Sequence, residues 1–391
     1  MHYLFMMSLY NLSGYDAVKF HLIQGRYVSS EMLNDVLLEL NKSAYVEINE
    51  IGKSVKKKSI SNIKIGFGPI KLLFWSQMHG NESTTTKAVI DLVNLLIKNY
   101  DSDSVTNLTN RCTLHIIPML NPDGADAYTR VNANSVDLNR DAQNLSQPES
   151  KILRNVFNEI KPDYCFNLHG QRTIFGTEYS GNSAVASFLA PSQDNKLSIT
   201  RNRAEAMRVI AYINLKLKKD LPNNVGVYDD AFNINCVGDT FQSLGIPTIL
   251  FEAGHIGSDY NREESRLYMF KALCFSLDYI SRSDLSYETD ISEYHKIPQN
   301  KKCFFDIILS NADINGKNYN LAIQYKEVLK DNSIEFQPQL EKINHLEDYY
   351  AHKNINLKNK IIDFPSEDDL KIGSDIDFVI ANNEKISLKI Y

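Results

Sequence analysis

The chain has 391 residues, which is enough for one large domain and a smaller one. Hydrophobic residues make up 43% of the sequence and charged residues 23%, proportions that are typical of a folded globular protein. The net charge of −6 comes without a long basic run, which argues against nucleic acid or an anionic membrane surface as the partner.

Cysteine usage and the start of the chain bear on where the protein works. Five cysteines are scattered without a CxxC pair, a pattern that predicts free buried thiols rather than a disulfide framework. The apolar residues 1–11 lack a basic leader and a small-residue cleavage site, so we expect no signal peptide. Later apolar runs are too short for a membrane-spanning helix. We therefore expect a cytoplasmic protein that does not enter a membrane.

Strand and helix patterns alternate through the first 280 residues. The almost unbroken apolar run at Lys71–Met78 predicts a strand buried on both faces, and the apolar spacing in Thr84–Lys98 predicts a helix. The same alternation continues with strands at Thr113–Leu120, Asp163–Leu168 and Pro247–Phe251, and with helices at Pro148–Ile160, Arg201–Lys219 and Asn261–Ile280. This order predicts an α/β domain with a mixed, largely parallel central sheet flanked by helices.

A polar stretch at Ser281–Asn300 has the composition of a linker. The sequence beyond it contains short strand-like segments, at Cys303–Leu309, Ile361–Phe364, Ile376–Ile380 and Ile386–Ile390. A helix is predicted over Leu321–Lys330. We therefore divide the chain into a larger domain over residues 1–285 and a small β-rich C-terminal domain over residues 296–391, to which the sequence assigns no role.

Polar side chains with the chemistry of metal ligands follow the predicted core strands. His79 follows the first of these strands and Glu82 comes three residues later, His169 ends another strand, and Glu252 directly follows a third. Because ligands bind at the carboxyl ends of strands in open α/β sheets, we expect these four side chains to lie on one rim.

A catalytic zinc ion needs three nitrogen or oxygen ligands and an open position, and His79, Glu82 and His169 supply such a set. Glu252 then remains available as a general base for water. Each residue alone also has an ordinary structural interpretation. A single strand-end histidine is commonly a hydrogen-bonded surface residue, and Glu82 alone fits the first turn of a helix.

Longer segments around these residues carry a resemblance. In chain order they are IGKSVKKKSISNIKIG (Ile51–Gly66), QMHGNE (Gln77–Glu82), NPDGADAYTRVNANSVDLNRD (Asn121–Asp141), NLHG (Asn167–Gly170) and LFEAGH (Leu250–His255). Together they resemble the zinc carboxypeptidases, or metallocarboxypeptidases, over roughly residues 50–280. The combination of segments is specific to this family, whereas HxxE alone is a weak signal.

The resemblance implies a role for eight residues. It makes His79, Glu82 and His169 the ligands of one zinc ion per chain and Glu252 the catalytic glutamate. It makes Arg130 the group that polarises the scissile carbonyl, Asn139 and Arg140 the pair that binds the substrate carboxylate, and Tyr228 the tyrosine that closes over substrate. A guanidinium fork suits a carboxylate, and positive charge suits a developing oxyanion, so the roles are chemically reasonable. Tyr228 lies 24 residues before Glu252 in the chain.

The resemblance implies a zinc metallocarboxypeptidase that hydrolyses amide bonds of peptides, cell-wall-type peptides included, or of small amides with a free carboxylate. HGNE and DLNR are also similar to zinc deacylases of N-acyl amino acids, such as aspartoacylase and succinylglutamate desuccinylase, although the NPDGA segment and Arg130 favour the peptidase. A third alternative is a non-catalytic binding module with the same fold. Gly238, where the family forms its side-chain pocket, has neither bulk nor charge, so the sequence does not give the natural substrate. It does not give the oligomeric state either.

Overall fold

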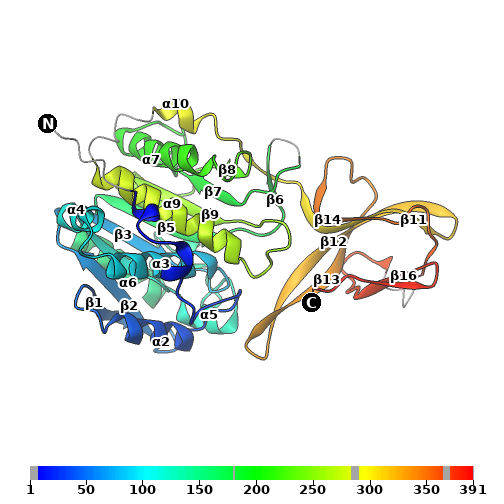
Figure 1. Ribbon diagram of the computed structural model, residues 1–391, viewed down its shortest axis with the longest axis horizontal. Coiled ribbons are helices and arrows are strands. Elements are labelled where there is room, and N and C mark those ends of the chain that lie inside the picture. The colour runs from blue at the N-terminus through cyan, green and yellow to red at the C-terminus, as the bar shows by residue number, and fades with distance from the viewer. Residues whose placement is uncertain (1–7, 179–180, 283–289, 364–369, 391) are drawn as a thin grey trace.

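A computed structural model describes residues 8–178, 181–282, 290–363 and 370–390, and arranges them around separate sheets (Figure 1). Residues 1–7, the predicted domain boundary at residue 285 and Phe364 lie outside the described residues. None of the described helices is long and apolar enough to cross a membrane.

The described residues of the N-terminal domain contain an eight-stranded sheet of order β1-β2-β4-β3-β5-β9-β7-β8. Its strands are β1 (Glu47–Lys53), β2 (Ser59–Gly66), β3 (Ile70–Ser76), β4 (Cys112–Ile117), β5 (Tyr164–Gly170), β7 (Ala186–Leu189), β8 (Val225–Val227) and β9 (Thr248–Ala253). The central strands β4, β3, β5 and β9 run parallel. At one edge β2 pairs antiparallel with β1 and with β4, and at the other edge β7 pairs antiparallel with β9 and parallel with β8. The predicted mixed, largely parallel sheet is confirmed.

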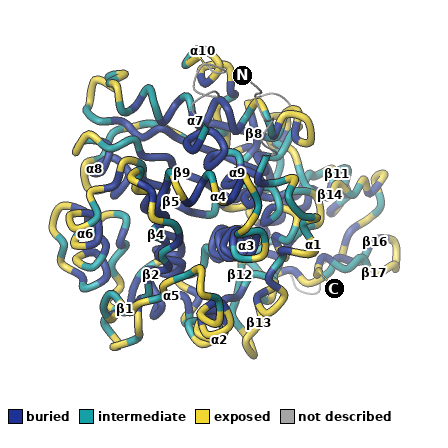
Figure 2. Tube along the Cα trace, turned by 60° about the vertical axis from the view of Figure 1, so that its left-hand side comes forward, coloured by how far each residue is buried: buried dark blue, intermediate teal, exposed yellow. Residues whose placement is uncertain are grey.

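Helices cover both faces of this sheet. Alternate side chains of a strand point to opposite faces, so each central strand contributes to two cores. Leu72 and Phe74 of β3 belong to a core shared with helices on one face, namely α2 (Ser30–Leu40), α3 (Thr84–Lys98), α4 (Asp103–Arg111), α7 (Arg201–Leu217) and α9 (Glu263–Ser281). Leu73 and Trp75 belong to a second core with α6 (Pro148–Ile160) and α8 (Val237–Ser243). Figure 2 shows α3 in the colour of buried residues along most of its length.

The remaining short elements of this domain lie in connections. They are α1 (Tyr15–Val18), α5 (Pro122–Ala127), α10 (Ile291–Tyr294), β6 (Phe175–Thr177), and the 3-10 turns Leu9–Asn11 and Leu138–Arg140. The predicted helices at Thr84–Lys98 and Pro148–Ile160 have the predicted bounds, and the predicted strands shift by one to three residues at their ends. No strand was predicted at β1 or β2, where short and largely polar segments pair at the edge of the sheet.

The described C-terminal residues form a four-stranded sheet, β13-β12-β11-β14, and a three-stranded sheet, β15-β16-β17. Their bounds are β11 (Phe304–Ile314), β12 (Lys317–Lys330), β13 (Ser333–Ile343), β14 (Tyr350–Asn356), β15 (Ile362–Asp363), β16 (Phe378–Ala381) and β17 (Glu384–Ser387). The β-rich character predicted for this region is confirmed. In addition, β10 (Asn300–Lys302) pairs with β6 of the N-terminal domain.

The helix predicted over Leu321–Lys330 is wrong, because this segment is part of the strand β12. Leu321 and Ile323 pack into one core while Ala322 packs into another, which is the alternation of a strand. The spacing of Leu321, Tyr325 and Val328 also fits a helix, so the local pattern is ambiguous. Pairing with β11 on one side and β13 on the other decides it.

Candidate active site

The turn that follows β3 directs two side chains toward the sheet edge. Gln77 has a left-handed backbone conformation (φ 48°), and its Nε2 donates to the carbonyl oxygen of Gly80 at 2.9 Å. The backbone N–H of Glu82 donates to the carbonyl oxygen of His79 at 3.1 Å. The side chains of His79 and Glu82 therefore leave one tight turn immediately before α3.

The NPDG segment supports this turn through hydrogen bonds of Asn121. The Asn121 side chain accepts a hydrogen bond from the backbone N–H of Gly124 at 2.9 Å, which caps α5. The same amide donates to the carbonyl oxygen of Met78 at 3.1 Å. The NPDG segment thus holds the HGNE turn, a structural role that its place in the family pattern did not reveal.

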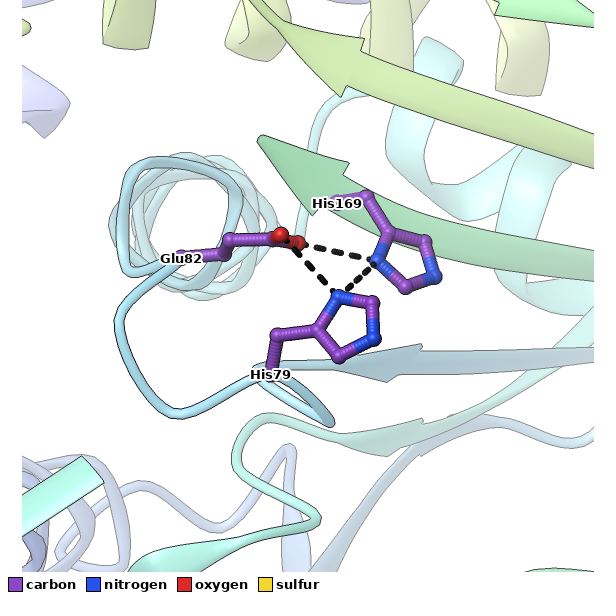
Figure 3. Close-up of side chains that lie close together, drawn as sticks. All are labelled: His79, Glu82 and His169. Atoms are coloured by element: carbon purple, nitrogen blue, oxygen red, sulfur yellow. Dashed lines mark hydrogen bonds and ion pairs between the residues drawn. The ribbon is translucent and has the colours of Figure 1, made fainter. Parts of the chain in front are cut away.

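The three predicted metal ligands converge (Figure 3). Nδ1 of His79 lies 3.0 Å from Oε1 of Glu82, and Nδ1 of His169 lies 2.9 Å from Oε2 of Glu82. The two Nδ1 atoms are 3.1 Å apart. Among the described residues, these three form the group whose ligand atoms lie close enough together to hold a metal ion.

This arrangement fits zinc. A triangle of ligand atoms with sides near 3 Å has points about 2 Å from every corner, the usual length of zinc bonds to nitrogen and oxygen. Two imidazoles and one carboxylate also match the donor set of catalytic zinc sites. His79 and His169 are almost fully buried, so little water competes for their Nδ1 atoms.

The charge around the site also favours a cation. Burial by itself would lower the pKa of His79, but Glu82 and Asp137 raise it to about 9. Burial would likewise raise the pKa of Glu82, yet the two histidines hold it well below its usual range. A positive charge is therefore stabilised between these groups, whether a proton or a metal ion supplies it.

Asp137, which the sequence interpretation did not single out, orients the site. Its Oδ1 lies 3.0 Å from Nε2 of His79, and its Oδ2 accepts a hydrogen bond from Nε of Arg130 at 3.1 Å. A carboxylate on the outer nitrogen fixes the tautomer that leaves Nδ1 free for a metal. The sequence feature that could have identified Asp137 is its position directly before the LNR segment.

Glu252 lies beside the ligands because β5 and β9 are neighbours, and His169 and Glu252 are partners in their register. Burial and the nearby Glu82 carboxylate raise the pKa of Glu252 well above its usual range. Its Oε2 has no hydrogen-bond partner among the described residues. A cation held by the ligands would oppose this shift and favour the charged carboxylate.

Arg130, Asn139 and Arg140 approach from the connection between α5 and α6. Nη1 of Arg130 lies 3.5 Å from Oε1 of Glu82. The Asn139 side chain accepts a hydrogen bond from the backbone N–H of Val237, and Nη1 of Arg140 donates to Sγ of Cys236 at 3.1 Å. Within the described part of the chain, no carboxylate forms an ion pair with Arg140, so its charge is available.

A cavity of about 660 Å³ joins these groups. All eight predicted site residues line it, namely His79, Glu82, Arg130, Asn139, Arg140, His169, Tyr228 and Glu252. Tyr228 directly follows β8, where its ring packs near Phe175. Burial, with Glu252 and Glu82 nearby, raises the pKa of its hydroxyl. The structure thus brings every predicted residue to one cavity, and their individual roles remain predictions.

Comparison with known families gives an independent match. The family model described as "Zinc carboxypeptidase" matches residues 36–235, just over half of the chain. Carboxypeptidase SOL1 of Arabidopsis thaliana is 29% identical over 174 residues, which cover 40% of this chain and 35% of that protein. Gamma-D-glutamyl-L-diamino acid endopeptidase 1 of Lysinibacillus sphaericus is 31% identical over 109 residues, which cover 26% of this chain and 28% of that protein. The chain therefore spans well under half the length of these relatives.

A solved structure shares the fold. A metallo-carboxypeptidase from Burkholderia cenocepacia superposes with a TM-score of 0.51 at 21% identity, over 64% of this chain and 70% of that one. At this identity the likeness concerns the fold alone.

Proposed function

Because the chain belongs to the zinc carboxypeptidase family, we propose that it is a zinc-dependent metallocarboxypeptidase that hydrolyses the C-terminal amide bond of peptides with a free carboxylate. One observation carries the proposal. One cavity is lined by the three candidate metal ligands, by Glu252 and by Arg140. Among the described residues, Oε2 of Glu252 has no hydrogen-bond partner and Arg140 has no ion-pair partner.

His79, Glu82 and His169 would hold the metal. When bound, a zinc ion supplies Lewis acidity beside the scissile carbonyl and makes water more acidic. Arg130 donates hydrogen bonds to the carbonyl oxygen as negative charge develops there. Asp137 keeps both His79 and Arg130 in place for these tasks.

Glu252 moves the proton. It accepts a proton from the attacking water as the new carbon–oxygen bond forms. It then delivers that proton to the leaving nitrogen as the carbon–nitrogen bond breaks, which yields a shortened peptide carboxylate and a free amino acid. Asn139 and Arg140 bind the terminal carboxylate and so place the last amide bond at the reacting groups. Tyr228 contributes a hydroxyl at the wall of the same cavity.

A substrate panel tests this proposal against the deacylase alternative. Zinc-loaded protein is offered peptides with free C-termini, the same peptides with C-terminal amides, and N-acyl amino acids. The panel includes γ-D-glutamyl peptides carrying a diamino acid, since one relative is named for that bond. Chelator-sensitive release of C-terminal residues from free peptides alone supports the proposal, whereas turnover confined to N-acyl amino acids supports the deacylase.

A protein that takes up no stoichiometric zinc and hydrolyses none of these substrates would instead support the non-catalytic alternative. Released amino acids are best detected in a discontinuous assay, because that readout does not depend on a chromogenic group in the cavity.

A further inference from the structure

A second cavity, of about 370 Å³, lies between the two domains. Glu82 and Arg130 line both this cavity and the one that contains the ligand triangle, so the two spaces meet at one of the metal ligands, Glu82. The C-terminal domain contributes Gln324, Tyr325 and Glu341 to its wall. Figure 1 shows the long β12–β13 hairpin that carries these residues reaching back beside the N-terminal domain.

Buried and partly buried polar contacts fix this wall in place. Nη2 of Arg26 donates to both carboxylate oxygens of Glu327 at 2.8 Å, and the hydroxyl of Tyr128 donates to the same carboxylate. The hydroxyl of Tyr260 donates to Asp306 at 3.0 Å. Hydrogen bonds between a guanidinium and a carboxylate are short and strong, so β12 is held against the N-terminal domain.

The connection after His169 is joined to the C-terminal domain as well. The backbone N–H groups of Cys303 and Phe304 both donate to the carbonyl oxygen of Ile174, at 3.1 and 3.0 Å. Nε2 of His352 lies 2.8 Å from the carbonyl oxygen of Thr173. The strand end that supplies a metal ligand and the C-terminal sheet are therefore parts of one packed unit.

Gln324, in the wall of the second cavity, has a side-chain carbonyl oxygen that accepts no hydrogen bond from the described residues. Its side chain is 5% exposed, and its Nε2 donates to Oγ1 of Thr173 at 2.6 Å and to Asp306. Its Oε1 has no hydrogen-bond partner among the described residues. A buried carbonyl oxygen without a partner is costly, and a ligand N–H in the adjoining cavity would satisfy it.

The residues proposed to bind the substrate carboxylate indicate which part of a peptide would reach the second cavity. Asn139 and Arg140 line the first cavity and do not line the second. A peptide with its terminal carboxylate at Arg140 and its last amide bond at the metal ligands therefore extends its preceding residues toward Gln324. Peptide N–H groups have the donor chemistry that this acceptor requires.

We propose that the C-terminal domain forms a binding subsite for the peptide segment that precedes the scissile bond. This inference rests on the proposed function and specifies its substrate as a peptide with at least two residues before the cleaved bond, rather than a dipeptide or an N-acyl amino acid. The domain is then part of the substrate site, and not a separate module.

The test compares an N-acetylated dipeptide with an N-acetylated tetrapeptide that ends in the same two residues, on the full-length zinc-loaded protein. We expect the wild-type kcat/KM to be at least about tenfold higher for the tetrapeptide, the effect of about one additional buried hydrogen bond. In Gln324→Leu this tetrapeptide-to-dipeptide ratio falls about tenfold. In Glu341→Trp, a substitution at an exposed position that fills the cavity, the ratio falls at least as far.

Lys330→Ala is the matched control. Lys330 lies on the same strand but pairs with Glu335 outside the cavity, so its ratio stays at the wild-type value. A wild-type protein that cleaves both substrates equally well, or variants that fold and keep the wild-type ratio, would overturn this inference and leave the proposed function standing. Failure of the wild-type protein to cleave either substrate would overturn both.

Discussion

Gly80 lies directly against Gly124, since a Cβ placed on Gly80 would fall 1.9 Å from the carbonyl carbon of Gly124. The contact joins the HGNE turn, which carries two metal ligands, to the NPDG helix. We predict that Gly80→Ala moves this turn, lowers the free energy of unfolding by about 3 kcal/mol and weakens zinc retention. Urea unfolding and metal analysis of the purified variant measure both effects.

Gly14→Ala is the control for this substitution. Gly14 has an ordinary negative φ, and no atom lies within 4 Å of the position its Cβ would take. We expect its stability to change by less than about 1 kcal/mol. Equal stability of the Gly80→Ala and Gly14→Ala proteins would show that the turn tolerates a methyl group at position 80.

Glu82 and Glu252 are expected to separate metal binding from catalysis. We predict that Glu82→Gln loses zinc, because the charged member of the ligand triangle is removed. Glu252→Gln keeps one zinc per chain but loses about 10²- to 10⁴-fold in kcat, the usual contribution of a general base. Metal content by mass spectrometry and turnover of a free peptide are the two readouts. Full activity of Glu252→Gln would remove this residue from the mechanism.

Asp137 is expected to act through His79. In Asp137→Asn the outer nitrogen of His79 loses its carboxylate partner, so we predict a 10- to 100-fold weaker affinity for zinc, roughly the cost of losing such a partner. Competition with a chelator of known affinity measures the change. Asp229→Asn, in the same cavity but hydrogen-bonded to Ala231, serves as control and should change affinity less than about twofold. Similar losses in both variants would contradict an orienting role.

Arg140 is expected to bind the substrate carboxylate. We predict that Arg140→Ala lowers kcat/KM about 100-fold for peptides with free C-termini, because a charge-assisted bidentate contact is lost. C-terminal amides, which lack that charge, should change by less than about threefold. The comparison uses one peptide in both forms, and equal losses on the two forms would refute the assignment.

Asp306 is expected to make stability depend on pH. Burial raises the pKa of this side chain to about 6 in the folded protein, while hydrogen bonds from Tyr325 and Tyr260 only partly oppose the shift. The folded state therefore holds a proton that the unfolded state releases near pH 4. Its stabilising effect is complete below about pH 4 and is lost as pH rises to about 6, by about 3 kcal/mol.

Asp306→Asn removes that titration and keeps an oxygen that accepts hydrogen bonds from Gln324 and Tyr325. We predict that the variant loses stability less steeply than wild type between pH 4 and pH 6 and is the more stable protein at pH 7. Thermal unfolding at a series of pH values provides the curve. Parallel pH profiles for both proteins would show that Asp306 does not titrate in this range.

The sequence by itself determined the class of fold and the candidate site residues. His79, Glu82, His169 and Glu252 follow buried strands, and parallel strands bring their carboxyl ends to one edge, so the sheet alone predicts their meeting. The helices at Thr84–Lys98 and Pro148–Ile160 were readable because their apolar spacing is local. The Arg130 and Arg140 assignments followed from the resemblance to the family, and the structure adds that both line the same cavity.

Tertiary structure decided what depends on contacts between distant segments. The sequence pattern of Leu321–Lys330 permits a helix or a strand, and only its pairing with β11 and β13 makes it a strand. The orienting role of Asp137 and the support that Asn121 gives to the HGNE turn arise between residues that are far apart in the chain. The second cavity forms between segments that are distant in the chain, and contacts such as that of Arg26 with Glu327, 301 residues apart, hold them together. Local propensity carries no record of such partners, because burial and hydrogen bonding across the fold select them.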